Sequence, residues 1–151
     1  MRKRIEVLHG VNLNMLGSRP SEHYGTFTLS ELEYAIEEYA RELDLEVTFF
    51  QTNSECDYVE RLHRARDAAD GLIINPGAWT HYSRAIRDAL EISALPAVEV
   101  HISDLSTREP WRQVSVVSEL CIATVMGRGR DGYRDALTAL KQRLGGDGVT
   151  A

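Results

Sequence analysis

The chain has 151 residues, of which 43% are hydrophobic and 26% are charged, and its formal net charge is −6. This length is enough for one domain with a substantial core, and no apolar run approaches the roughly 20 residues of a membrane helix. An acidic chain is also a poor match for the phosphate backbone of nucleic acid. We therefore expect a single domain over residues 1–151 that binds neither a membrane nor nucleic acid.

The first third of the chain indicates a strand, a long loop, a helix and a second strand. Ile5 to Leu8 is a short apolar strand, and the polar stretch from Gly10 to Gly25 is about three times the usual length of a connection. Residues 28–31, Thr-Leu-Ser-Glu, have the form of a helix capping box, and apolar residues then recur at helical spacing as far as Leu43. Leu45 to Phe50 is rich in strand-forming residues.

The same alternation continues to the end of the chain. After a turn at residues 51–55 come a helical stripe, a strand, a turn, a further helix, two strands and a closing helix. Their expected places are a stripe on Val59, Leu62 and Ala69, a strand at Gly71–Ile74, a turn at Asn75–Gly77, a helix around Ile86, Ala89 and Leu90, strands at Pro96–Val100 and Cys121–Met126, and a helix at Tyr133–Leu144. We expect the glycine-rich residues 145–151 to be a frayed tail.

Five strands alternating with helices predict a parallel sheet covered by helices on both faces, because parallel neighbours need crossover connections. We expect the flavodoxin-like three-layer sandwich, with strand order 2-1-3-4-5. Ligands of such sheets bind beyond the carboxyl ends of the strands, where the strand order reverses. Candidate site residues should therefore follow the first, third and fourth strands.

Arg19 and Tyr24 lie in the long loop after the first strand. A tyrosine is almost entirely protonated at neutral pH, and a nearby cation stabilises the tyrosinate form. The pair is thus a candidate general base. The alternative is a surface arginine beside a tyrosine that packs its ring, and this loop could also close over a site as a lid.

Glu99 and His101 are separated by one residue on the fourth strand, so both side chains point to the same face. The carboxylate can then orient the imidazole, as in acid–base sites, although an E-x-H pair is also common in structural roles. Beyond them, Ser103 and neighbouring backbone N–H groups could receive a carboxylate.

Two further groups are candidates for binding. The turn Asn75-Pro76-Gly77-Ala78 offers an amide and backbone donors for a water or an oxyanion, and His81, at the start of the next helix, could donate to a substrate hydroxyl. Arg108 and Arg112 bracket Trp111 and form an anion clamp or simply surface charge.

Signatures of metals and cofactors are missing from the sequence. The five histidines and the two cysteines, Cys56 and Cys121, fit no zinc or disulfide spacing, and no glycine-rich nucleotide loop follows the first strand. Ile5 to Leu8 is too short for a secretion signal. We expect a cytoplasmic protein without a metal or an organic cofactor.

Several motifs, in order along almost the whole chain, resemble type II 3-dehydroquinate dehydratase. They are Gly10, Asn12-Leu13-Asn14, Leu16-Gly17, Arg19, Tyr24-Gly25, Ile74 to Ala78, Thr80-His81, Arg87 to Leu90, Glu99 to Ser103, Arg108-Glu109 and Arg112. The resemblance implies a lyase of the shikimate pathway, in aromatic amino acid biosynthesis or quinate metabolism, which converts 3-dehydroquinate to 3-dehydroshikimate by anti elimination through an enolate.

The resemblance also implies a role for each site residue. Tyr24, activated by Arg19, would be the base, and His101, backed by Glu99 and hydrogen-bonded to Asn75, would be the acid. Asn12 would hold a water against the enolate. The residues implied to bind substrate are Asn75, Gly77, Ala78, His81, Asp88, Ile102, Ser103 and Arg112. Asp88 would reach the site of a neighbouring subunit, in a dodecamer built from trimers.

The chain departs from the family pattern at positions outside the proton-transfer residues: Val11, Pro20, Ser21, Ser54, Glu55, Cys56, Trp79, Trp111, Val114 and Val116. These departures affect the lid, the subunit packing and the pathway served. Two other readings stay open: a non-catalytic binding module that keeps the pocket, and a metal-dependent hydrolase using His81, His101 and Asp88.

Overall fold

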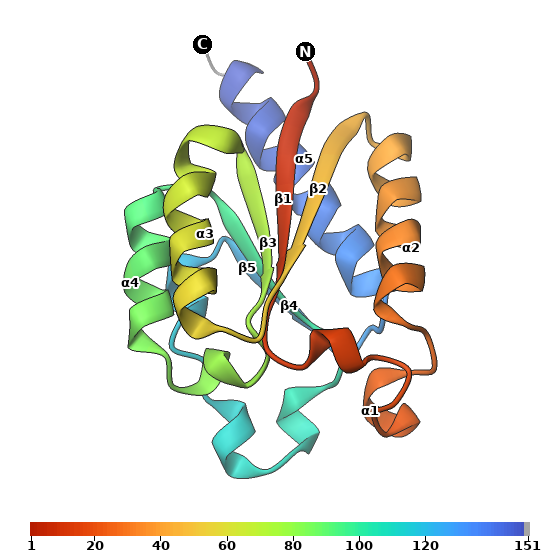
Figure 1. Ribbon diagram of the computed structural model, residues 1–151. Coiled ribbons are helices and arrows are strands. Elements are labelled where there is room, and N and C mark those ends of the chain that lie inside the picture. The colour runs from red at the N-terminus through yellow and green to blue at the C-terminus, as the bar shows by residue number, and fades with distance from the viewer. Residues whose placement is uncertain (150–151) are drawn as a thin grey trace.

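The computed structural model describes residues 1–149, which form a parallel sheet flanked by helices (Figure 1). The strands are β1 (Lys3–His9), β2 (Leu45–Gln51), β3 (Gly71–Asn75), β4 (Ala97–His101) and β5 (Ala123–Met126). Their order in the sheet is β2-β1-β3-β4-β5. The predicted flavodoxin-like arrangement is therefore confirmed.

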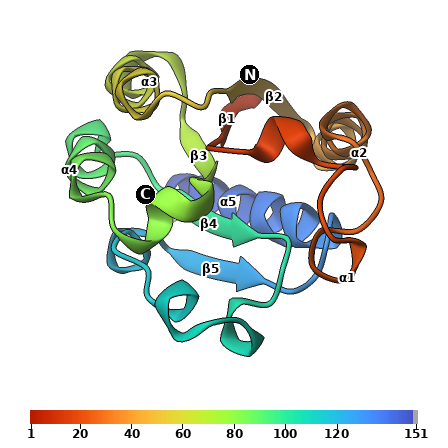
Figure 2. The same cartoon turned by 60° about the horizontal axis from the view of Figure 1, so that its bottom comes forward.

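Two helices cover each face of the sheet (Figures 1 and 2). The helices are α1 (Ser21–Tyr24), α2 (Leu29–Glu42), α3 (Glu55–Ala68), α4 (Arg84–Ser93) and α5 (Asp131–Val149). Helices α2 and α5 share one apolar core with side chains such as Val7 and Val98, whereas α3 and α4 share the other with Leu8 and Leu72. Successive strand residues thus enter opposite cores, as the alternation of side chains in a strand requires.

The capping signal that predicted the first long helix is present in full. Thr28 Oγ1 accepts from the Glu31 backbone N–H at 3.2 Å, and Glu31 Oε1 accepts from the Thr28 N–H at 3.0 Å. Two backbone donors of the first turn of α2 are thereby satisfied. Strands β3 and β4 are buried at every position, because helices cover both of their faces.

Some boundaries differ from those predicted. Strand β1 extends to His9, since it is paired with β2 and β3 on both sides. Strand β5 begins at Ala123 rather than at Cys121, whose backbone N–H donates to Ser118 at the end of a 3-10 turn. Helix α5 continues to Val149 through glycines that we expected in a frayed tail, because propensity is only a weak preference once a helix is under way. Residues 150–151 lie outside the described residues.

The connections that follow β1, β3 and β4 contain short 3-10 segments: η1 (Leu13–Met15), η2 (Gly77–His81), η3 (Leu105–Thr107), η4 (Pro110–Gln113) and η5 (Ser118–Leu120). The turns after β1 and β3 touch at Gly10, whose N–H donates to the Asn75 carbonyl at 2.8 Å. A Cβ atom on Gly10 would lie 2.3 Å from the Pro76 carbonyl oxygen, so only glycine permits this approach. None of the helices in residues 1–149 is long and apolar enough to cross a membrane.

Candidate active site

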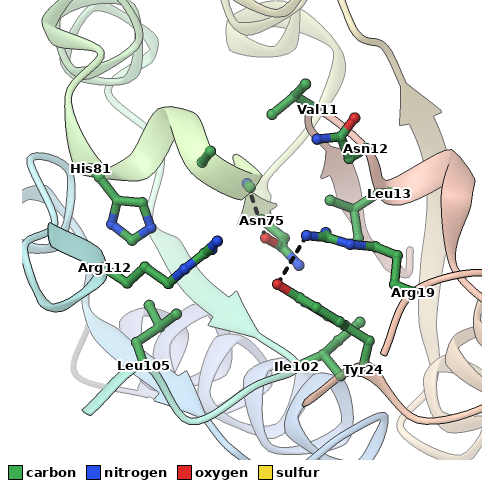
Figure 3. Close-up of a pocket in the computed structure, with 12 residues that line it drawn as sticks. Val11, Asn12, Leu13, Arg19, Tyr24, Asn75, His81, Ile102, Leu105 and Arg112 are labelled. Atoms are coloured by element: carbon green, nitrogen blue, oxygen red, sulfur yellow. Dashed lines mark hydrogen bonds between the residues drawn. The ribbon is translucent and has the colours of Figure 1, made fainter. Parts of the chain in front are cut away.

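An open pocket of about 110 Å³ lies beyond the carboxyl ends of β1, β3 and β4 (Figure 3). It is lined by Val11, Asn12, Leu13, Arg19, Tyr24, Asn75, Gly77, Ala78, His81, Ile102, Leu105 and Arg112. Nine of these twelve residues were predicted from the sequence. The other three, Val11, Leu13 and Leu105, are apolar wall residues that carried no chemical signal. The pocket occupies the edge at which the strand order reverses, as expected for this topology.

The Tyr24 hydroxyl oxygen accepts hydrogen bonds from two guanidinium groups. Arg19 Nη2 donates to it at 3.0 Å, and Arg108 Nη1 donates at 3.1 Å. The Arg19 guanidinium also lies 3.9 Å from the centroid of the Tyr24 ring. Two cationic donors therefore converge on one phenol oxygen, and hydrogen bonds from charged donors are stronger than those from neutral ones.

Arg108 contacts the base, a role that the sequence did not indicate. The sequence left open an anion clamp with Arg112 or simple surface charge, whereas the Arg108 side chain turns toward Tyr24 and lies 3.5 Å from Ser103 Oγ. Burial works against its charge, but the contacts with Tyr24 and Glu109 outweigh that cost and raise the pKa of Arg108 above its ordinary value. It is therefore a permanent cation at the base.

Asn12 sits at the start of η1 with φ 70° and ψ 1°, a left-handed conformation that asparagine tolerates better than most residues. Its backbone N–H donates to Asn53 Oδ1 at 2.9 Å, and Asn53 Nδ2 donates to Asn14 Oδ1 at 3.3 Å. The loop after β2 therefore holds the loop that carries Asn12 at the pocket. Sequence reasoning did not identify Asn53, because its partners lie about forty residues away.

Both ends of the Asn75 amide are engaged. Asn75 Oδ1 accepts from the Gly77 N–H at 3.1 Å, and Asn75 Nδ2 donates to the Tyr133 hydroxyl at 3.2 Å. Burial raises the pKa of Tyr133 to about 12, so this hydroxyl stays protonated. The expected bond between Asn75 and His101 is not among the hydrogen bonds of residues 1–149, in which His101 is bonded to Glu99 instead.

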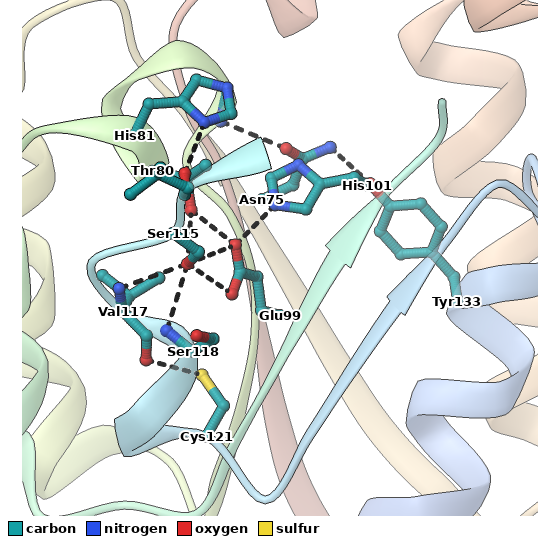
Figure 4. A network of polar contacts seen from close by, with 12 residues as sticks. Asn75, Thr80, His81, Glu99, His101, Ser115, Val117, Ser118, Cys121 and Tyr133 are labelled. Carbon is teal, nitrogen blue, oxygen red and sulfur yellow. Dashed lines mark hydrogen bonds and ion pairs between the residues drawn. The ribbon is translucent and has the colours of Figure 1, made fainter. Parts of the chain in front are cut away.

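Glu99 and His101 form the pair that their spacing on β4 predicted (Figure 4). His101 Nε2 lies 2.6 Å from Glu99 Oε2, and both side chains are almost completely buried. Burial favours the neutral acid, but hydrogen bonds from His101, Thr80 and Ser115 outweigh it and lower the pKa of Glu99 below its ordinary value. Glu99 is therefore a buried carboxylate.

A hydrogen bond of His81 fixes which of its two ring nitrogens carries the proton. His81 Nδ1 lies 2.7 Å from the Val114 carbonyl oxygen, which can only accept, so the proton sits on Nδ1. Burial lowers the pKa of His81 below its ordinary value, and the neighbouring His101 and Arg112 add to this effect. The neutral ring thus presents Nε2 as an acceptor, while the Arg112 guanidinium, lying 4.1 Å from the Trp111 ring centroid, supplies the nearby donors.

The remaining candidates differ in their position relative to this pocket. Ile102 contributes to its wall, Ser103 is buried next to Arg108, and Asp88 is exposed on α4 and does not line it. Within residues 1–149, one group of three potential metal ligands comes together, Cys56, Asp57 and Glu60, on the exposed surface of α3. His81, His101 and Asp88 do not form such a group in that part of the chain. Cys56 and Cys121 are both free thiols.

Comparison with known proteins identifies the family. The model of the family "Dehydroquinase class II" matches residues 3–141. The chain is 49% identical to 3-dehydroquinate dehydratase of Thermotoga petrophila over 141 residues, covering 93% of this chain and 96% of that protein. It is 46% identical to 3-dehydroquinate dehydratase 2 of Pseudomonas putida over 144 residues, covering 95% and 97%.

Solved structures agree with these relatives. The crystal structure of type II dehydroquinase from Propionibacterium acnes superposes with a TM-score of 0.89 at 44% identity, covering 94% of this chain and 98% of that one. The type II dehydroquinase of Butyrivibrio crossotus gives a TM-score of 0.88 at 40% identity, covering 92% and 97%. The resemblance seen in the sequence motifs is confirmed, and the chain belongs to the class II dehydroquinase family.

Proposed function

We propose that this protein dehydrates 3-dehydroquinate to 3-dehydroshikimate, a step of the shikimate pathway, with Tyr24 as the base. The observation that carries the proposal is the Tyr24 hydroxyl, which accepts from both Arg19 and Arg108 at the pocket wall. The chain is 49% and 46% identical to two named dehydratases over more than 90% of its length, which supports the same reaction.

In this mechanism the Tyr24 phenolate removes a proton from the carbon next to the substrate ketone. The electrons of the broken C–H bond move toward the carbonyl carbon, and the carbonyl oxygen becomes an enolate. Asn12, at the pocket wall, holds a water that donates to this oxygen. Arg19 and Arg108 contribute by stabilising the negative charge on the tyrosine before it accepts the proton.

The second step expels the C1 hydroxyl. The enolate electrons return to form the new C=C bond as the C–O bond breaks, and His101 supplies the proton that turns the leaving hydroxide into water. The buried Glu99 carboxylate keeps the imidazole oriented. The acid comes from β4 and the base from the segment after β1, so the two would reach the substrate from different directions, and an anti elimination needs them on opposite faces of the substrate.

Residues around the same pocket would bind the substrate. Ile102 and Ser103 at the end of β4 would receive the substrate carboxylate, and Gly77 and Ala78 lie in the turn after β3 that would face the ring. His81, as an acceptor, and Arg112, as a donor, would contact the ring hydroxyls.

We also propose that Asp88, exposed on α4, contributes to the pocket of a neighbouring subunit in a dodecamer that is built from trimers. The position of Asp88 away from its own pocket supports this assignment. Light scattering of the purified protein measures the assembly. Loss of substrate affinity in Asp88→Asn without a change of assembly would support the contact, and unchanged affinity would contradict it.

The decisive measurement is the enone absorbance that appears when purified protein meets 3-dehydroquinate. We expect turnover that survives chelator treatment, since no metal enters the mechanism. Tyr24→Phe should abolish turnover while substrate still binds in calorimetry. Tyr34→Phe, which removes the same hydroxyl from a tyrosine that is 69% exposed on α2, is the matched control.

Two outcomes would overturn the proposal. Binding without turnover in the unaltered protein would indicate a non-catalytic module that keeps the pocket, and activity that requires zinc would indicate a hydrolase.

A further inference from the structure

Ser115, in the loop between η4 and η5, can act toward Glu99 only as a donor. Its Oγ accepts from the backbone N–H groups of Val117 at 3.3 Å and Ser118 at 3.1 Å, which occupy both lone pairs of the hydroxyl oxygen. Its one proton points to Glu99, 2.9 Å from Oε1 and 3.0 Å from Oε2. Figure 4 shows these hydrogen bonds of Ser115 beside the Glu99 carboxylate.

Thr80, in η2, adds a second hydroxyl to the same carboxylate. Thr80 Oγ1 donates to Glu99 Oε2 at 2.5 Å, and Thr80 is fully buried. A protonated Glu99 could not donate its proton to Ser115, whose oxygen has no lone pair left to accept it. The two hydroxyls therefore favour the carboxylate over the acid, because hydrogen bonds to the charged form stabilise that form.

The charge on Glu99 decides where the proton of His101 sits. A carboxylate can only accept, so His101 Nε2, at 2.6 Å, must carry a hydrogen. Nδ1 is then the nitrogen left to exchange a proton. We infer that Ser115 and Thr80 are positioning residues that hold Glu99 as a carboxylate and thereby fix the proton of His101 on Nε2.

The other titratable groups around Glu99 do not replace these hydroxyls. Tyr58 on α3 is fully buried, which raises its pKa well above the ordinary value, and burial raises the pKa of Cys121, next to η5, to about 12. Both therefore stay neutral at working pH. His81 in η2 gives its Nδ1 proton to Val114, and His101 is the titratable group whose side chain bonds to the Glu99 carboxylate in residues 1–149.

The loop that carries Ser115 also contacts the segment of the pocket wall that contains His81. The Val116 N–H donates to the Thr80 carbonyl at 2.8 Å, and His81 contacts the Val114 carbonyl, so residues 114–116 are fastened to η2. Arg112 lies in η4, directly before this loop. Loss of the Ser115 hydroxyl would therefore be felt first at Glu99 and only secondarily at the residues that contact substrate.

The test uses 15N-labelled histidine and NMR spectra of the full-length protein above neutral pH, where the tautomer of neutral His101 can be read directly. The His101 signals are assigned with His101→Asn. Thr80→Val removes the hydroxyl at nearly constant volume, Thr80→Ser restores it, and Ser115→Ala removes the other one. Thr138→Val makes the same change at an exposed hydroxyl on α5 that bonds only within its helix.

We expect one tautomer, with the proton on Nε2, in the unaltered protein, Thr80→Ser and Thr138→Val, and a mixture in Thr80→Val and Ser115→Ala. Since a hydrogen bond to a charged group is lost, kcat should fall by about 10- to 100-fold with KM nearly unchanged. The acidic limb of the kcat profile should move up by about one pH unit, because protonation of Glu99 becomes easier.

An unchanged single tautomer together with an unchanged pH profile in Thr80→Val and Ser115→Ala would overturn the inference. If Ser115→Ala does not fold, the Thr80→Val and Thr80→Ser pair decides alone. The kinetic readout rests on the proposed function, but the NMR readout does not. Absence of turnover in the unaltered protein would remove the proposed function and leave the tautomer test intact.

Discussion

Arg108 Nη1 donates to the hydroxyl oxygen of Tyr24 at 3.1 Å, although the two residues are 84 positions apart in the sequence. Tyr24 follows the first strand, and Arg108 follows the fourth. Their contact joins the loop that carries the base to the segment beyond the acid. The Arg108 side chain is only 9% exposed, so water screens this interaction less than it would at the surface.

Arg108→Met should lower kcat about 10- to 100-fold, because it removes one charged donor to the tyrosinate while keeping the length of the side chain. Arg19→Met should do the same, and the double variant should lose more than either single one. Arg134→Met, at an exposed arginine on α5, is the matched control. Steady-state kinetics measure the effect, and an Arg108→Met protein with full kcat would show that Arg19 suffices.

Gly10→Ala should destabilise the fold and abolish activity together. The added Cβ would lie 2.3 Å from the Pro76 carbonyl oxygen, so the turns after β1 and β3 must separate and displace Asn12 and Asn75. Gly145→Ala is the control, since nothing lies within 4 Å of a Cβ there. Thermal unfolding and turnover of both variants check this, and a native-like melting temperature in Gly10→Ala would contradict it.

The pKa of Glu99 is lowered in the folded protein, which makes stability depend on pH in one direction. Its contribution is present above the ordinary pKa of 4.5 and is lost as pH falls through the lower folded pKa. Urea unfolding between about pH 3 and pH 7 should therefore show a fall at the acid end that is smaller in Glu99→Gln. Parallel curves for the two proteins would mean that Glu99 is equally charged when folded and unfolded.

Tyr133→Phe should cost about 1 to 3 kcal/mol of stability, because Asn75 Nδ2 would lose its partner in a buried place. The freed amide can also turn away from the Gly77 N–H, so we expect KM to rise more than kcat falls. Tyr39→Phe, which removes a hydroxyl bonded at 3.3 Å to Asp131 near the surface, is the comparison. Equal stability losses in the two variants would argue against a special role for Tyr133.

Much of the architecture could be predicted from the sequence, because local steric effects set the periods at which side chains repeat along helices and strands. Alternating strand and helix patterns predicted the parallel sheet, and the form of residues 28–31 predicted a cap that is present atom for atom. The spacing of Glu99 and His101 predicted their shared face, since side chains alternate along a strand. The ends of some elements were not predicted, as at β5 and α5. There, strand pairing and the continuation of an existing helix override the conformational preference of the local residues.

The sequence by itself therefore determined the strand order, the edge that holds the site and most of the residues that line it. Only the tertiary structure decided which donors meet which acceptors. In the folded protein the Arg108 side chain lies against Tyr24 rather than beside Arg112. The Asn75 amide is hydrogen-bonded to Gly77 and Tyr133, and the Val114 carbonyl contacts His81. Such contacts join residues far apart in the chain, and their geometry follows from packing of the whole sheet and its loops rather than from local spacing.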